Sequence, residues 1–584
     1  MPQEPLRIGN CSGFYGDRLA AMREMLDGGP LDVLTGDYLA ELTMLILWRN
    51  RLKDPARGYA TTFLRQLEDC LGLALDRGVR IVVNAGGLNP AGCAEAVRAL
   101  ADRLGLSAQV AHVEGDDLLP RLAEIQAAGE QLAHLDTGAP LASAPSPPVT
   151  ANAYLGAWGI AGALDTGADV VVCGRVTDAS LVVGPAAQHF GWARDDWDAL
   201  AGAVVAGHVL ECGPQATGGN YAFFTELPAA THLGFPLAEV HADGSCVITK
   251  HPGTDGAVSL GTVTAQLLYE IGGARYAGPD VVARFDTIAL EEDGADRVRI
   301  SGVRGEPAPG TNKVCLNIVG GFRNSVTYIL TGLDVEAKAA LVERQLFDAA
   351  GGRDAYREVD VRLARTAHED PDTNERASAT LRISVKDSDP DRVGRAFSSA
   401  AVELALASYP GCTMTAPPGD AAPYGVYWPA LVPADVVDQV VVHADGRRVP
   451  VAAAPTGDAE VVVEPPAVSG VPSGETVRLP LGRVFGARSG DKGGTANLGV
   501  WARSDAAYAW LAASLTVDRL RELLPECAGL AVERHDFPNL RAVNFLLPGL
   551  LGEGVASSTR FDPQAKGLGE WLRARVVELP AALL

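Results

Sequence analysis

Short apolar runs alternate with stretches of helically spaced apolar residues over the first third of the chain. The runs predicted as strands are Leu6–Ile8, Leu31–Leu34, Arg80–Val83, Val110–Val113 and Val170–Cys173. Runs of this length that end at glycine are typical of strands buried on both faces of a parallel sheet. Strands that alternate with helices predict right-handed βαβ units. We therefore expect a large, mostly parallel α/β domain over residues 1–323.

Polar residues follow each of these strands. They are Asn10, Asp37, Asn84, Glu114 and, after the last strand, Arg175 with Asp178. The carboxyl ends of parallel strands share one edge of a sheet, and open α/β sheets bind ligands there. Gly, Asn and Asp are also common in tight turns, so one such strand end would indicate little. Five in succession favour a shared, water-accessible ligand site.

The pattern changes after residue 323. Between 324 and 451 it predicts the order β-α-β-β-α, which fits a ferredoxin-like α+β lobe. Residues 452–475 contain four prolines among small residues and are predicted to be a linker. Residues 476–584 again mix strands with two helical stretches, which indicates a small C-terminal α+β domain.

Composition narrows the class of protein. The chain of 584 residues is too long for one hydrophobic core, and its formal net charge of −23 disfavours binding to nucleic acid or to anionic membrane surfaces. Nine cysteines occur singly without a CxxC pair, which favours a reducing compartment. No secretory signal and no apolar stretch long enough to span a bilayer are visible. We expect a cytoplasmic protein.

Four ionisable residues near the fifth strand are candidate catalytic groups. They lie in two glycine-broken turns, 174–180 and 207–220, and are Arg175, Asp178, His208 and Glu211. Glu211 has apolar neighbours, so its pKa could be raised and it could act as acid or base. Asp178 beside Arg175 would stay ionised, and His208 could be the complementary acid. The alternatives are a local Arg175–Asp178 ion pair and a core histidine at 208.

Glycine-rich turns supply candidate anion-binding groups. Residues 249–256 precede a helical stretch and lack the Walker A order, and residues 486–494 are either a solvated hairpin or an anion-accepting turn that closes over the large domain. The amides near residue 218 could hold an oxyanion. The predicted anion-binding residues are Lys250, Gly253, Thr254, Gly218, Gly219, Arg488 and Lys492.

Metal and cofactor signals are weak. Zinc spacings such as HExxH are missing, and residues 9–13 lack the GxGxxG pattern of a dinucleotide site. No cofactor is predicted. A Mg²⁺ site stays open as an alternative, because magnesium needs only a few carboxylates. The acidic residues available for it are Asp37, Glu41, Glu114, Asp116 and Asp117.

Several sequence blocks, taken in order, resemble the acyclic terpene utilisation family AtuA. The blocks are Arg7–Asn10 with Gly16–Arg18, Leu34–Glu41, Asn84–Gly87, Gly174–Ser180, Glu211–Gly219, Lys250–Gly253 and Ser489–Gly493. The resemblance covers nearly the whole chain. It implies a large amino-terminal AtuA region followed by a small ferredoxin-fold domain, in agreement with the linker at 452–475.

The resemblance also implies a metabolic setting. The family is named after the breakdown of branched acyclic terpenoids, whose intermediates are coenzyme A thioesters. We therefore expect an anionic small-molecule substrate, a coenzyme A thioester, and acid/base chemistry such as hydration, dehydration or isomerisation. The alternative is a non-catalytic accessory protein that organises an acyl-CoA enzyme. We also expect a homo-oligomer.

Overall fold

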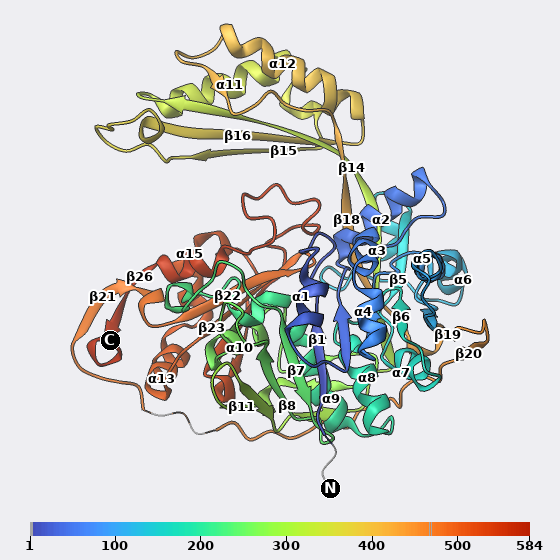
Figure 1. The fold of residues 1–584 in the computed structure, drawn as a ribbon. Helices are drawn as coiled ribbons and strands as arrows, with labels where there is room; N and C mark the ends of the chain where they lie inside the picture. The colour runs from blue at the N-terminus through green and yellow to red at the C-terminus, as the bar shows by residue number, and fades with distance from the viewer. Residues whose placement is uncertain (1–3, 467, 469) are drawn as a thin grey trace.

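An eleven-stranded sheet forms the centre of the large domain (Figure 1). The computed structural model describes residues 4–466, 468 and 470–584. Five neighbouring strands pair in parallel, in the order β1 (Leu6–Asn10), β2 (Val33–Gly36), β3 (Arg80–Val83), β6 (Val170–Cys173) and β4 (Val110–Glu114). Antiparallel strands extend the β1 edge with β7 (Pro236–Val240), β8 (Cys246–Lys250), β12 (Val298–Ser301) and β11 (Ala289–Glu292), and the β4 edge with β19 (Val440–Val442) and β20 (Arg448–Pro450).

Helices cover both faces of this sheet, which is why its strands are continuously apolar. Val170 and Val172 pack in the core on one face, and Val171 and Cys173 pack in the core on the other. The first face is covered by α1 (Ala21–Gly28), α3 (Thr61–Glu68), α4 (Leu71–Asp76) and α5 (Pro90–Leu104). The second face is covered by α7 (Trp158–Asp165), α8 (Ser180–Phe190) and α9 (Trp197–Leu210).

The predicted α/β class is confirmed, with two differences in detail. The parallel core is flanked by antiparallel strands on both edges, so the sheet is mixed. The predicted turn at Gly207 is wrong, because α9 continues to Leu210. Gly207 is needed for packing: a Cβ at this position would lie 2.7 Å from the Cα of Ala179, at the start of α8.

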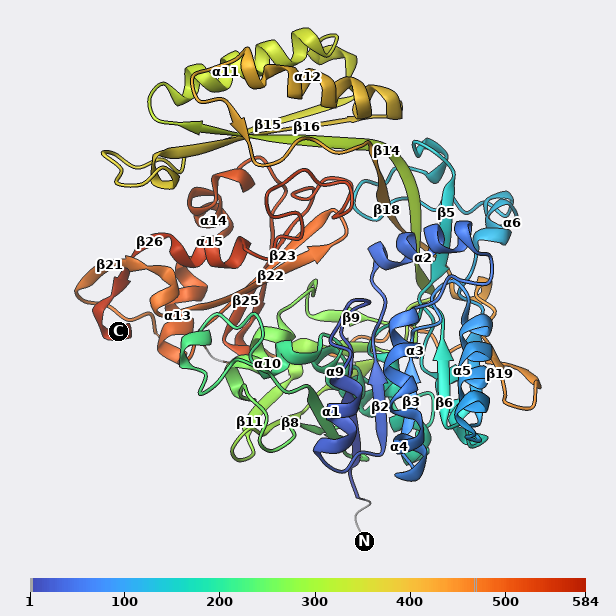
Figure 2. The same cartoon turned by 45° about the horizontal axis from the view of Figure 1, so that its top comes forward.

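A ferredoxin-like lobe projects from the large domain (Figure 2). Its strand order is β15-β16-β14-β17, with all pairs antiparallel. Its elements are β14 (Thr311–Thr331), α11 (Val335–Ala349), β15 (Glu358–Ala364), β16 (Ser378–Asp387), α12 (Phe397–Glu403) and β17 (Thr413–Met414). The chain returns through β18 (Ala422–Pro433), which pairs with β14, and β5 (Pro148–Ala153) pairs with the root of β14. The proposed boundary at residue 323 falls within β14.

The C-terminal domain has a second antiparallel ferredoxin-like sheet, in the order β22-β23-β25-β24. Its strands are β22 (Gly486–Lys492), β23 (Thr495–Trp501), β24 (Glu533–Phe537) and β25 (Ala542–Leu547), and its helices are α13 (Asp505–Ser514), α14 (Val517–Leu523) and α15 (Leu568–Ala574). A two-stranded sheet of β21 (Thr476–Pro480) and β26 (Val576–Pro580) joins its ends. No helix in the described part of the chain is long and apolar enough to cross a membrane.

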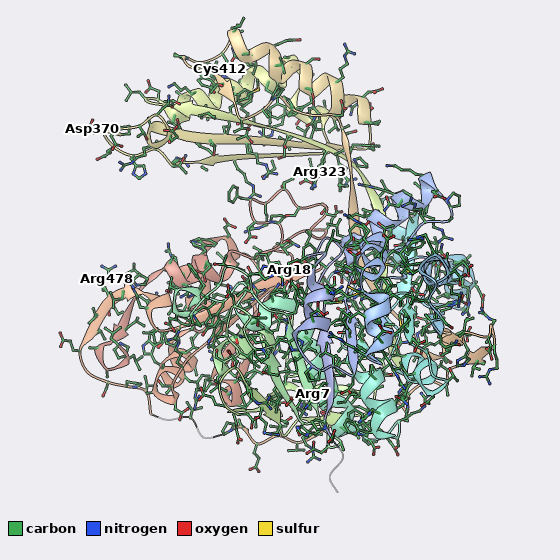
Figure 3. All side chains as sticks on the ribbon, viewed as in Figure 1. Arg7, Arg18, Arg323, Asp370, Cys412 and Arg478 are labelled. Atoms are coloured by element: carbon green, nitrogen blue, oxygen red, sulfur yellow. The ribbon has the colours of Figure 1, made fainter. Side chains whose placement is uncertain are left out.

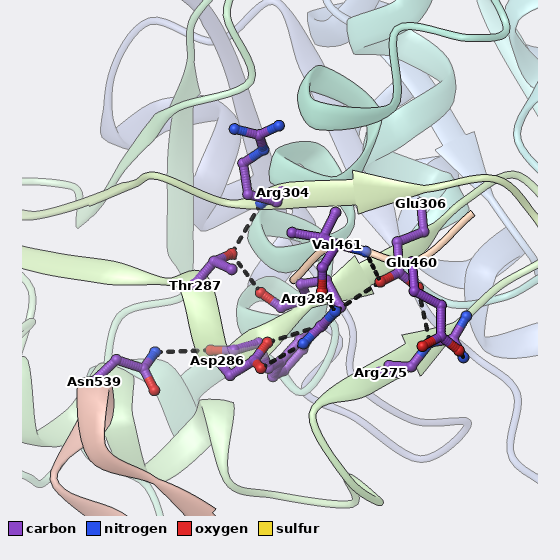
Figure 4. Close-up of polar contacts among 10 residues, drawn as sticks. Arg275, Arg284, Asp286, Thr287, Arg304, Glu306, Glu460, Val461 and Asn539 are labelled. Carbon is purple, nitrogen blue, oxygen red and sulfur yellow. Dashed lines mark hydrogen bonds and ion pairs between the residues drawn. The ribbon is translucent and has the colours of Figure 1, made fainter. Parts of the chain in front are cut away.

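The linker and the C-terminal domain are both fastened to a small sheet of the large domain (Figure 4). This sheet consists of β9 (Arg275–Ala277), β10 (Val282–Arg284) and β13 (Arg304–Glu306). The amide of Val461 in the linker donates to Oε1 of Glu306 (2.8 Å), and Arg284 donates to the carbonyl of Val461. Asn539 of the C-terminal domain donates to the carbonyl of Phe285 (2.8 Å). These contacts position the C-terminal domain against the large one.

Candidate active site

The carboxyl edge of the parallel strands brings polar residues together, as the alternation of strands and helices predicts. The Asn84 amide donates to Oδ1 of Asp37 (2.5 Å), which joins the ends of β2 and β3. The Arg175 backbone amide donates to Oδ2 of Asp116 (2.9 Å), which joins the ends of β6 and β4. The Asn10 amide donates to the carbonyl of Leu210 (2.5 Å) at the end of α9.

Charged residues gather next to this edge in a group that we call the central cluster. It comprises Asp37, Glu41, Arg175, Asp178, Glu211, Glu270, Lys313 and Lys492. Glu41 begins α2 (Glu41–Lys53), Glu270 follows α10 (Leu260–Leu267), Lys313 lies near the root of β14, and Lys492 ends β22. The large domain, the strand that leads to the lobe and the C-terminal domain therefore all contribute to one site.

Arg175 is the most buried cation of the central cluster, with 3% of its surface exposed. Its Nη2 donates to Oδ1 of Asp178 (3.1 Å), its Nη1 donates to the carbonyl of Leu39 (3.3 Å), and its guanidinium lies 4.4 Å from the centre of the Tyr154 ring. Burial opposes its charge, but Asp178 and Glu41 raise its pKa. The predicted Arg175–Asp178 pair is thus present and forms part of a larger group.

The carboxyl groups of the cluster have opposite pKa shifts. Burial disfavours the charge of Glu41, but Lys313 and Arg175 outweigh it and lower the pKa of Glu41 to about 2. The hydroxyl of Tyr154 donates to Oε1 of Glu41 (2.8 Å). Burial raises the pKa of Asp178, as does Glu41, although Arg175 opposes this rise. Neighbouring carboxyl groups with divergent pKa values are typical of acid/base sites.

Glu211 and His208 form a buried pair at the end of α9. Oε1 of Glu211 lies 3.1 Å from Nδ1 of His208, and the two side chains are 8% and 1% exposed. Burial raises the pKa of Glu211 well above its usual value and lowers the pKa of His208 to about 4. His208 is therefore neutral near pH 7 and lacks the proton that the expected acid role requires, whereas burial favours the protonated form of Glu211. Oε2 of Glu211 has no hydrogen-bond partner among the described residues.

Lys492 and Arg488, which sequence patterns placed in a loop, lie on strand β22 and face the large domain. Nζ of Lys492 donates to the carbonyl of Glu270 (3.0 Å). Burial lowers the pKa of Lys492, as does Lys313. The Arg488 guanidinium lies 4.2 Å from the centre of the Tyr269 ring, and Arg488 donates to the side chain of Gln215. Lys492 thus belongs to the central cluster, with Arg488 beside it.

The turn at Lys250 stands apart from the central cluster. Nζ of Lys250 donates to the carbonyl of Thr254 (2.8 Å) and lies 3.2 Å from Oδ2 of Asp296. The Thr254 hydroxyl donates to the carbonyl of His251 (2.8 Å), and Gly253 is exposed between them. No bond links this turn to the central cluster within the described residues, and its positive charge is already paired.

The two backbone amides predicted to bind an oxyanion already donate to carbonyl groups of the protein. The amide of Gly219 donates to the carbonyl of Pro214 (2.9 Å), and the amide of Gly218 donates to the carbonyl of Gln215 (3.4 Å). They close the short 3₁₀ turn after α9. The cationic side chains of the central cluster, rather than these amides, are therefore the groups placed to receive negative charge.

The acidic residues considered for Mg²⁺ do not converge. Glu114 bonds to His112 (2.9 Å) and to Arg448 (2.7 Å) at its own edge of the sheet, and these partners lower its pKa to about 2 although burial opposes them. Within residues 4–466, 468 and 470–584, no group of three or more His, Cys, Asp or Glu side chains is arranged to hold a metal ion.

Sequence reasoning missed part of the site, namely Tyr154, Glu270, Lys313 and Tyr427. The hydroxyls of Tyr154 and Tyr427 lie 3.5 Å apart, and the Lys313 ammonium lies 4.9 Å from the centre of the Tyr154 ring. Lys313 and Tyr427 lie in the long antiparallel strands β14 and β18, Tyr154 directly follows β5, and Glu270 follows α10. None of them follows a strand of the parallel core, where the edge rule applies. The sequence feature that could have identified a missed site residue is at Lys313, a cation directly before the apolar run 314–316.

These features define the class. It is a mixed α/β protein in which one set of acid/base groups is surrounded by the edge of the parallel sheet, by strand β14 and by the ferredoxin-like C-terminal domain. The model of the acyclic terpene utilisation family protein AtuA matches residues 6–443, and that of the AtuA ferredoxin-like domain matches residues 479–578. The chain belongs to the AtuA family. A search of curated proteins finds no match.

Proposed function

We propose that the protein is an enzyme that performs acid/base chemistry on an anionic acyl substrate. The observation that carries this proposal is Glu211, a buried carboxyl with a raised pKa and one oxygen without a hydrogen-bond partner among the described residues. Its neighbours in the central cluster include the carboxyl groups of Asp178 and Glu270 and the cation of Lys492. A buried carboxyl whose protonated form is favoured can donate a proton, and a buried carboxyl oxygen without a hydrogen-bond partner is a candidate functional group. Glu211 acts as the proton donor.

The other members of the cluster have matching roles. Asp178 keeps 28% of its side chain exposed and is paired with Arg175, so it can accept a proton from bound substrate. Arg175, Lys313 and Lys492 hold the oxygen on which negative charge develops. In a dehydration, Asp178 removes the proton next to the carbonyl and Glu211 protonates the departing hydroxyl, which leaves as water. His208, whose Nδ1 lies 3.1 Å from Oε1 of Glu211, packs against the Glu211 carboxyl and restricts its position.

The substrate class follows from the family and from the charge of the site. The family name refers to the utilisation of acyclic terpenes, and the branched acids formed from such compounds are processed as acyl thioesters. Hydration, dehydration and isomerisation of an enoyl or hydroxyacyl thioester each require one donor, one acceptor and a stabilised enolate oxygen. The proposed substrate is a branched acyl-coenzyme A.

Glu211→Gln is the test. The amide keeps the shape of the carboxyl but has no proton to transfer, so turnover should fall by about 10²- to 10⁴-fold. The assay is mass spectrometry of branched enoyl- and hydroxyacyl-coenzyme A incubated with the protein, scored for gain or loss of water. Melting temperature should stay nearly unchanged, because the amide keeps the size and shape of the carboxyl and burial of Glu211 disfavours its charged form.

Glu336→Gln is the matched control, because Glu336 is exposed on the lobe and paired only with Arg365 (2.8 Å). It should leave turnover unchanged. If the wild-type protein alters none of the thioesters, the proposal of catalysis fails. A partner enzyme that then co-elutes from a sizing column would support the accessory role instead.

A further inference from the structure

The sheet of the lobe has one face packed on helices and one open face. Val326, Tyr328 and Leu330 of β14 pack in the core under α11 and α12, so the alternate residues of β14 point to the other side. Figures 1 and 2 show both helices on the side of the lobe away from the large domain. The open face is therefore turned toward the rest of the molecule. Figure 3 places Arg323 there, beside the strands β14 and β18 that connect the lobe to the large domain.

Three arginines at this face have no carboxylate partner among the residues that the structure describes. Arg323 donates only to the carbonyl of Ser558 (3.3 Å), and Arg49 of α2 donates only to the carbonyl of Pro423 (2.8 Å). The side chain of Arg382 on β16 forms no hydrogen bond or ion pair with any described residue. Burial lowers the pKa of Arg323, as do the neighbouring positive charges of Arg382 and Arg49. These three residues are the arginine face.

Neighbouring cations on the same sheet are paired, so the unpaired ones stand out. Nζ of Lys386 lies 2.9 Å from a carboxyl oxygen of Glu358, and Nε of Arg362 lies 2.7 Å from a carboxyl oxygen of Asp360. In a chain with a net charge of −23, carboxylates are abundant. Three arginines left without one form a local excess of positive charge.

The arrangement of β16 costs stability. Arg382 lies directly opposite Arg362 in the register of β15 and β16, and like charges at directly opposed positions are destabilising. Ser384, two residues further along the same face, is buried, and its hydroxyl has no hydrogen-bond partner among the described residues. An anion that bound here would neutralise the arginines and could accept a hydrogen bond from the Ser384 hydroxyl.

The separation between the arginine face and the central cluster follows from two lengths, one along helix α2 and one along strand β18. Glu41 and Arg49 lie eight residues apart on α2, which is about 12 Å along the helix axis. Tyr427 lies near Tyr154, the partner of Glu41, and Pro423 accepts from Arg49. Tyr427 and Pro423 are four residues apart on β18, which is roughly 13 Å along the strand. An elongated ligand can therefore reach both places.

We propose that the arginine face binds the phosphate groups of the substrate carrier, while the acyl end occupies the central cluster; this inference rests on the proposed function. The ligand class is an acyl thioester linked to a phosphorylated nucleotide, and the recognised part is its adenosine 3′-phosphate 5′-diphosphate. Several phosphates along one ligand suit several separated arginines. Guanidinium groups bind phosphate oxygens through paired, charge-assisted hydrogen bonds.

The test is isothermal titration with adenosine 3′,5′-bisphosphate and adenosine 3′-phosphate 5′-diphosphate as probes, without any acyl group. Arg323→Gln and Arg382→Gln should each weaken binding about tenfold or more, and binding to the wild type should weaken with added salt. Arg376→Gln is the matched control, because Arg376 is an exposed arginine of the same lobe that pairs with Asp372 (2.7 Å). Unchanged affinity in both arginine variants would overturn the proposal.

A second measurement separates this site from the proposed chemistry. Glu211→Gln should bind the nucleotide probes as the wild type does, because it removes no phosphate contact. Arg382→Gln should raise the KM for an acyl-coenzyme A without changing the KM for the corresponding acyl-pantetheine. Binding of the probes without any turnover would refute catalysis and keep the phosphate site. Turnover with equal KM for both thioesters in wild type and variant would refute the phosphate site alone.

Discussion

Two sheets of the same ferredoxin-like type meet their surroundings in different ways. The C-terminal sheet uses its open face as an interface, where Asn497 accepts from the amide of Glu270 (2.7 Å) and donates to the carbonyl of Leu268 (3.1 Å). The lobe sheet leaves its open face accessible, with Ser325 exposed beside the arginine face. One module is docked, and the other is held away from the body on two strands.

Small residues make the docking possible. A Cβ on Gly499 would lie 2.6 Å from the Cβ of Leu268, and a Cβ on Gly490 would lie 2.3 Å from the Tyr269 ring. The open face of the lobe sheet instead carries the larger polar side chains Arg323, Arg382 and Lys386. The comparison teaches that the sheet architecture is neutral toward function and that the residues on its open face decide between an interface and a ligand surface.

The largest expected effect is at the docked face, with Asn497→Leu. The substitution leaves the buried amide of Glu270 and the carbonyl of Leu268 without partners, and each unsatisfied group costs about 1–3 kcal/mol. We expect the free energy of unfolding to fall by about 3 kcal/mol and turnover to fall with it, because Glu270 belongs to the central cluster. Urea denaturation and the thioester assay measure the two effects.

Thr327→Leu on the open face of the lobe is the counterpart. It lies on β14, which occupies the place that β23 takes in the C-terminal sheet, and it should change stability by less than about 0.5 kcal/mol. Equal losses in the two variants would contradict the distinction between a docked and a free face.

The effect expected from Asp491→Asn, near the end of β22, depends on pH. Burial and the neighbouring Glu270 raise the pKa of Asp491 to about 8, above its value of about 3.9 in an unfolded chain. The folded state thus holds a proton that the unfolded state has lost, and wild-type stability should decline as pH rises from about 4 to 8.

Asp491→Asn should remove this decline, by at most about 1.4 kcal/mol per pH unit. The measurement is urea unfolding at pH 5, 6, 7 and 8. Parallel pH profiles for the two proteins would show that Asp491 is not held protonated at the interface.

The smallest effect, and the one with opposite sign, is expected from Arg382→Thr. It removes the repulsion opposite Arg362 and places a β-branched residue in a strand. Thermal melting should show a gain of about 0.5 kcal/mol, while binding of adenosine 3′-phosphate 5′-diphosphate weakens about tenfold or more. A loss of stability would mean that Arg382 supports the fold rather than a ligand.

The parallel core and much of its polar edge follow from sequence pattern alone. Buried strands such as Val170–Cys173 have a distinctive apolar run, and the topology of parallel sheets then places Asp37, Asn84 and Arg175 at one edge. The lobe and C-terminal domain were equally visible, because their helices and strands are separated by clear turns.

Residues from long antiparallel strands were not predictable in this way. Lys313 and Tyr427 reach the central cluster because β14 and β18 pair over twelve registered positions, and pairing register between distant segments is not encoded in local pattern. The Gly207 turn was predicted because glycine usually breaks helices. Close contact between two helices selected glycine there instead.

The entry and exit of the lobe lie side by side. Arg323 of β14 pairs with Ala422 of β18, and Gly321 pairs with Tyr424, so nearly one hundred residues depart and return through adjacent points. A tight hairpin turn spanning those points would close the remaining chain without moving any strand of the main sheet. The lobe therefore has the geometry of an insertion, a unit that evolution can lengthen, trade or delete while the rest of the molecule keeps its shape.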